Sequence, residues 1–155
     1  MSLVAAGNTQ TLPSAPIINN GFWPDIDPAR FRDAHRIGTT ITAVRAIDAL
    51  THAMAETNRL LRHWQQTQRD RGFALASAVP LDEWQLPGTF AAQYCRAVFS
   101  LAHANLVERY RDYDTTNSGD KRADQLIDPA DDYRRDAAWA ISTIEGRPHS
   151  TVELI

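Results

Sequence analysis

The segment from Phe90 to Tyr113 places the strongest constraint on the fold, because its apolar residues follow two sides of a helix. One stripe contains Phe90, Tyr94, Val98 and Leu101, and the other contains Cys95, Phe99, Ala102, Leu106 and Tyr110. A helix that is apolar on two sides packs against neighbours on both of them. We therefore expect an all-α fold, a small bundle of about four helices with this segment at its centre and Cys95 as a small buried hydrophobe.

Three further helices are predicted around this central one. Each begins at a polar capping residue, which proline follows in two cases, and each ends close to a glycine. They run from Pro28 to about Arg36, from Thr40 or Thr42 to just before Gly72, and from Pro129 to Glu145. The chain is thus divided into an extended N-terminal arm (1–27), a helical bundle domain (28–146) and a strand-like C-terminal tail (147–155).

The N-terminal arm has no Lys, Arg, Asp or Glu before Asp25, and two prolines prevent a long helix in it. It ends in Phe22, Trp23 and Pro24, which we interpret as an anchor that fills a groove of a partner. The alternative is that Phe22 and Trp23 fold back onto the core of their own chain, as large aromatic residues often do.

The predicted helix before Gly72 has an apolar face and a basic one. The apolar face comprises Val44, Ile47, Leu50, Met54 and Leu61. Asn58 stands where this face should be apolar, so it is either an interface or register residue or an ordinary solvated or locally bonded asparagine.

The basic face carries Arg45, His52 and Arg59 at intervals of seven, with Arg62 and His63 close by. Such a stripe can contact phosphates, so a helical nucleic-acid-binding protein using this face is the alternative function. Acidic residues interrupt the stripe at Asp48 and Glu56, however, and these favour a solvated face that pairs with itself.

Two features of the bundle suggest contacts with partners. The connection between Gly72 and Gly88 contains two prolines and Trp84, and it is long for a compact domain, so we expect a functional or partner-contacting loop. Trp139 points away from the predicted inward face of the last helix. It is therefore an interface candidate, although it can equally cover an adjoining helix or loop of its own chain.

Acidic and basic residues alternate in the segment from Glu108 to Asp124, which therefore suits a contact between subunits better than a phosphate site. The predicted contacts here are Arg109, Arg111, Asp112, Lys121 and Arg122. The tail has Thr151, Glu153 and Ile155 on one face of a strand and Val152 and Leu154 on the other. No other convincing strand is predicted, so the tail is expected to add to a sheet of a neighbouring subunit or partner.

Motifs for chemistry are missing from the sequence. Its seven glycines form neither a P-loop nor a Gly-x-Gly-x-x-Gly run, and its five histidines show no His-Glu-x-x-His pattern. We expect no catalytic residue, no cofactor, no metal and no enzymatic activity. A formal charge of -3 argues against binding by general attraction to phosphates. The longest apolar stretch falls far short of the roughly 20 residues that span a bilayer, so no membrane is expected.

Four runs of the sequence carry a family resemblance. They are Arg96-Ala97-Val98, Leu106-Val107-Glu108-Arg109-Tyr110-Arg111-Asp112-Tyr113-Asp114, Gly119-Asp120-Lys121-Arg122-Ala123-Asp124, and Gly146-Arg147-Pro148 with Thr151-Val152-Glu153-Leu154-Ile155. Together with Gly21-Phe22-Trp23-Pro24-Asp25 before the first helix, they resemble the head completion proteins of P2-like tailed bacteriophages.

The resemblance implies a structural virion protein, assembled in the host cytoplasm, that joins the head after DNA packaging. It implies a ring of copies under the portal protein, twelve by analogy with connector adaptors, on which the tail or its terminator docks. Double-stranded DNA would pass through the channel of this ring. The uncharged arm and the unpaired tail are independent features that suit a subunit docked onto its neighbours.

Overall fold

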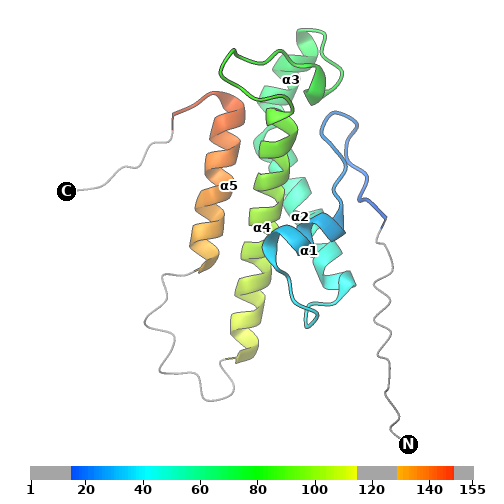
Figure 1. The fold of residues 1–155 in the computed structure, drawn as a ribbon, viewed down its shortest axis with the longest axis vertical. Coiled ribbons are helices and arrows are strands. Elements are labelled where there is room, and N and C mark those ends of the chain that lie inside the picture. Colours follow the sequence, from blue (N-terminus) through cyan, green and yellow to red (C-terminus); the bar gives the residue numbers. More distant parts are fainter. Residues whose placement is uncertain (1–14, 115–128, 149–155) are drawn as a thin grey trace, which may run out of the picture.

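A computed structural model describes residues 15–114 and 129–148 of the chain. The described residues form α1 (Pro28–His35), α2 (Ala43–Leu60), α3 (Arg62–Asp70), the short 3₁₀ helix η1 (Ala76–Ala78), α4 (Thr89–Asp114) and α5 (Pro129–Glu145). Figure 1 shows α2, α4 and α5 side by side, with α1 lying across α2 and α4, and with α3 at one end. The expected mostly helical fold is confirmed.

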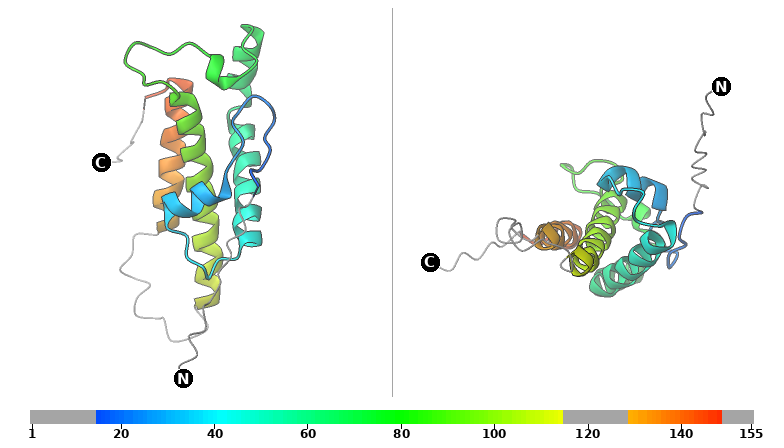
Figure 2. Two further views of the ribbon diagram at one scale, coloured as in Figure 1. Left: turned by 45° about the vertical axis from the view of Figure 1, so that its right-hand side comes forward. Right: turned by 90° about the horizontal axis from the view of Figure 1, so that it is seen from below.

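The centre of the bundle is α4, as its two apolar stripes predict. It packs against α5 on one side and α2 on the other, an order that is visible from two further directions in Figure 2. Tyr94 and Val98 are fully buried, and Phe99 nearly so. Cys95 is also buried, which raises the pKa of its thiol, so its interpretation as a small core residue is confirmed.

The predicted second helix is in fact two helices, because the backbone turns at Leu61 (φ -89°, ψ 5°) between α2 and α3. The prediction of one continuous helix up to Gly72 is therefore wrong. The turn brings Trp64 against Phe90 at the start of α4, with 5.0 Å between the ring centroids. Leu61 itself is fully buried. Packing against α4 thus decides this bend, and no breaker residue marks it in the sequence.

The apolar face of α2 also differs from the prediction at its start. Val44 is 76% exposed, and Ala46 and Ala49 are buried in its place. Small side chains at these positions allow the backbone of α2 to approach α4 closely. Further along the helix, the predicted core positions Leu50 and Met54 are buried.

Local capping was predicted well. The Asp27 side chain accepts a hydrogen bond of 2.8 Å from the amide of Ala29 and starts α1, and Thr42 caps α2 in the same manner. Arg36, in the left-handed region at φ 51°, ends α1 two residues before Gly38. At the end of α5, Gly146 takes φ 67° as a helix-terminating glycine does.

Residues 15–27 fold back onto the bundle instead of extending from it. Ile17 and Ile26 pair in antiparallel fashion through backbone hydrogen bonds of 2.7 and 3.0 Å. The loop between them lies along the outside of the bundle in Figure 1 and inserts Phe22 and Trp23 into the core. The described part of the predicted arm is therefore part of the folded domain, because its aromatic side chains are buried by their own chain.

Candidate interaction surfaces

The folded-back segment is held in place by a stack of aromatic rings. Trp23 lies between Tyr94 of α4, at 4.7 Å and an interplanar angle of 8°, and Trp64 of α3, at 5.4 Å and 23°. The Phe22 ring meets that of Trp23 edge to face at 5.1 Å. Phe22 and Trp23 are only 2% and 3% exposed, so they adopt the alternative that the sequence left open, an anchor in their own core. Pro24 beside them is half-buried.

A closed ring of three hydrogen bonds joins the same segment to two helices. The Asn19 amide donates to the Tyr94 hydroxyl (2.9 Å), this hydroxyl donates to Asn58 (2.8 Å), and Asn58 donates back to Asn19 (2.9 Å). Burial of the hydroxyl raises the pKa of Tyr94. Asn58 is thus locally bonded, and its role is to fix the N-terminal segment against α2 and α4.

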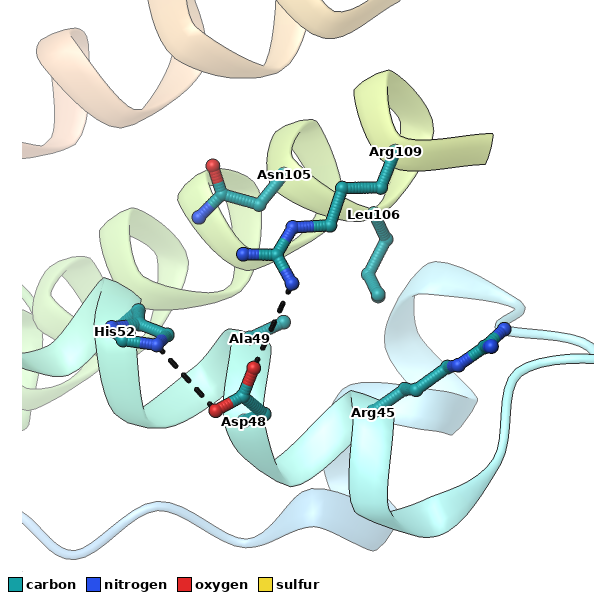
Figure 3. A pocket seen from close by; sticks show the side chains of 7 residues that line it. All are labelled: Arg45, Asp48, Ala49, His52, Asn105, Leu106 and Arg109. Carbon is teal, nitrogen blue, oxygen red and sulfur yellow. Dashed lines mark ion pairs between the residues drawn. The ribbon is translucent and has the colours of Figure 1, made fainter. Parts of the chain in front are cut away.

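A polar cleft lies between α2 and α4. It has a volume of about 380 Å³, and its walls are visible in Figure 3. The lining residues are Arg45, Asp48, Ala49, His52, Asn105, Leu106 and Arg109. The Asp48 carboxylate lies 3.4 Å from His52 and 3.7 Å from Arg109, so one acid stands between two basic groups.

Arg109, a predicted subunit contact, is therefore one of the residues that line this cleft. Its side chain is 71% exposed, and its ion pair with Asp48 is long. Exposed pairs of this kind contribute about 0–1 kcal/mol, so Arg109 can exchange this carboxylate for one of a partner at small cost.

The basic face of α2 pairs largely with itself, as the acidic residues in it indicated. Arg59 forms a two-pronged contact with Glu56 at 2.6 and 2.8 Å, and this hydrogen bonding lowers the pKa of the Glu56 carboxyl. His52 contacts Asp48, and Arg62 donates to the backbone oxygen of Arg59. The carboxylates of Glu56 and Asp48 reduce the positive charge that the face offers to phosphates.

The polar contacts between α4 and α5 were not anticipated from the sequence, because the partners are far apart along the chain. Asp136 of α5 binds Arg96 and accepts a 2.8 Å hydrogen bond from Ser100. Burial alone would raise the pKa of Asp136, but hydrogen bonds from these two residues lower it overall. Arg134 likewise bridges Glu108 of α4 and Asp131 of its own helix.

A pair of histidines lies where α1, α4 and α5 meet. The Nδ1 atoms of His35 and His103 are 2.9 Å apart, and the His103 ring stacks on Tyr133 with centroids 4.0 Å apart. One Nδ1 atom must accept a hydrogen bond from the other, so at least the accepting ring must be neutral, and the contact is lost when both rings are protonated. Burial lowers the pKa of both histidines, and proximity to His35 helps to bring that of His103 to about 4.

Acidification is therefore expected to destabilise the bundle through this pair. Both pKa values are lower in the folded chain, so the unfolded chain takes up protons first as the pH falls from 6.5 towards about 4. The free energy of unfolding should decrease by about 1–2 kcal/mol over this range, a figure reduced because water reaches these half-buried rings. His103→Gln should flatten the dependence of the melting temperature on pH, whereas the control His63→Gln should not. An unchanged slope in His103→Gln would refute the assignment.

The connection between α3 and α4 presents an apolar surface. Leu75, Leu81, Trp84 and Leu86 are 49%, 38%, 72% and 77% exposed, and we call these four residues the 75–86 surface. Beside it lies a hollow of about 80 Å³, whose apolar lining includes Ala76, Val79 and Phe90. The concentration of large exposed apolar side chains agrees with the expected partner contact, which stays a prediction.

Trp139 points outward from α5, as predicted. Its side chain is 38% exposed, and the Arg135 guanidinium lies over the ring at 5.6 Å from the centroid. The ring is therefore a flat exposed face bordered by a cation, which suits an interface.

The remaining predicted contacts lie outside the described part of the chain. They are the side chains of Arg111 and Asp112 in α4, Lys121 and Arg122 in the following connection, and the tail residues Thr151, Val152, Glu153, Leu154 and Ile155. Within residues 15–114 and 129–148, no three His, Cys, Asp or Glu residues are placed to hold a metal ion. No described helix is both long and apolar enough to cross a membrane.

Sequence comparisons point to one family. Residues 17–155 match the family described as "Phage head completion protein (GPL)". The chain is also 38% identical over 141 residues to the "Head completion/stabilization protein" of Escherichia phage P2. The aligned region covers 90% of this chain and 83% of that protein. No solved structure is significantly similar to it.

Proposed function

The chain belongs to the family of phage head completion proteins, and from this premise we propose that it is a connector subunit between the phage head and the tail. Its family makes it a structural component of the virion that completes the head. The proposed finer role is to form a ring of copies under the portal protein after DNA packaging, and to offer a platform for the tail or its terminator.

The observation that carries this proposal is that candidate contact surfaces lie on different sides of one small bundle. The 75–86 surface lies at the end of the bundle where α3 sits, whereas Trp139 belongs to α5 and the polar cleft lies between α2 and α4. A subunit of a closed ring needs two different faces for its two neighbours, and further faces for the components above and below.

Polar contacts between copies are the second part of the proposal. Arg109 lines the cleft with its side chain 71% exposed, and the alternating charges up to Asp124 follow it along the chain. We expect Arg109, Arg111, Lys121 and Arg122 to pair with carboxylates of a neighbouring copy, including its Asp112. Twelve copies are expected by analogy with connector adaptors.

Passing DNA is the third expected partner. The net charge of -3 suits a channel wall that does not retain phosphates, since a strongly positive lining would bind DNA in a salt-dependent manner. The self-paired basic face of α2 is in keeping with this expectation.

Withholding the chain during assembly tests the proposal. Cells that lack it should accumulate heads that have packaged DNA but carry no tail, and supplying the chain should restore complete particles. Electron microscopy and a count of infectious particles measure both effects. Normal tailed particles in its absence would overturn the proposed function.

A further inference from the structure

The 75–86 surface holds four of the eight exposed large apolar side chains of the described chain. Trp84 and Leu86, at 72% and 77% exposure, are both more exposed than Trp139 on α5. Exposed apolar residues gathered on one loop are typical of an interaction site. A single chain gains nothing from keeping both side chains in water, because burying them would stabilise the protein by about 25 cal/mol for each Å² of apolar area removed from water.

The neighbouring hollow indicates what kind of group covers this surface. Its volume of about 80 Å³ lies between η1 and the start of α4, next to Leu81. This is room for an aliphatic side chain, and the walls formed by Val79 and Phe90 are apolar. The occupant should therefore be an extended segment with branched aliphatic side chains.

The C-terminal segment of the chain has this composition. Val152 and Leu154 lie two residues apart, so a strand places them on one face with about 6.6 Å between them. Leu154 can then fill the hollow while Val152 lies against Trp84 or Leu86. The segment also leaves at the right height, because the end of α5 lies beside the connection from Val79 to Gly88 in both views, and rotation about a ring axis places the same surface of the next copy at that height.

We propose that the 75–86 surface and its hollow bind residues Thr151–Ile155 of a second copy of the chain. This inference rests on the proposed function, because in a ring each copy gives one tail and receives one, so that every surface is filled. It goes beyond that function by naming the surface on which the tail docks.

Photo-crosslinking in assembled particles tests the inference. A photoreactive benzoylphenylalanine replaces Ile155, which lies on the opposite face of the strand from Leu154 and so leaves the side chain in the hollow unchanged; particles are irradiated, and mass spectrometry locates the new bond. We expect a covalent dimer of the chain joined between position 155 of one copy and residues 75–88 of another. Bonds only to another virion protein, only elsewhere on the second copy, or only within one copy would each overturn the inference.

A matched pair of substitutions adds a second readout. Leu86→Ser should lower the yield of the crosslinked dimer by about tenfold, as loss of an interface anchor does. Val44→Ser removes an equally exposed side chain (76% against 77%) from another part of the bundle and should leave the yield unchanged. Equal yields for the two variants would refute the assigned surface.

Failure of this inference is distinguishable from failure of the proposed function. If the chain is present in particles and head completion requires it, but the tail crosslinks elsewhere, only the docking surface is wrong. If tailed particles form without the chain, the proposed function itself fails.

Discussion

Deleting residues 149–155 is expected to leave a folded helical chain that no longer completes heads. The hydrophobic core of the described chain is built from residues 22–144, so it does not depend on the deleted segment. The deleted segment carries the strand-like pattern with which a subunit is proposed to reach its neighbour. The number of infectious particles should therefore fall by a factor on the order of 10³ or more. Every copy in a ring loses the same contact, so the losses add up within one assembly.

Circular dichroism and thermal unfolding of the truncated chain provide the control for folding. The helical signal and the melting temperature should match those of the full chain. Asp33→Asn, which changes an exposed side chain of α1 outside the tail, should retain infectivity. Wild-type titres from the truncated chain would show that the tail assignment is wrong.

Trp23→Ala is expected to cause a large loss of stability in the folded chain. The ring is buried between Trp64 and Tyr94, so its removal leaves a large cavity and frees the folded-back segment. Truncation of a buried tryptophan costs about 3–5 kcal/mol. The midpoint of thermal unfolding should consequently fall by about 10 °C or more.

Trp84→Ala is the matched control for that substitution, because the same side chain is there 72% exposed. Its free energy of unfolding should change by about 0.5 kcal/mol or less. Urea unfolding of both variants measures the difference. Similar stabilities for the two variants would contradict the assignment of Trp23 as the anchor of the N-terminal segment.

Local signals in the sequence predicted most helix ends, because a cap acts within one turn. Asp27 before proline and Gly146 after α5 both mark real ends. The two apolar stripes of the segment from Phe90 also predicted the central helix, since an apolar side needs a neighbour to cover it.

Features that depend on distant partners were not predictable in this way. The turn at Leu61 arises because Trp64 packs on a helix that begins at Thr89, and nothing in the local sequence breaks the helix there. The same holds for the ion pair of Arg96 with Asp136 on another helix. The burial of Trp23 was one of two open alternatives, because aromatic residues suit a partner's groove and their own core equally well.

The central claim is that this chain stands between the head and the tail, and an averaged electron microscopy map of complete particles tests it most directly. The account predicts a ring of copies of the helical bundle beneath the portal, with residues 147–155 of each copy reaching the next. A map in which the chain is missing from this position, or in which it decorates the head shell instead, would contradict the account.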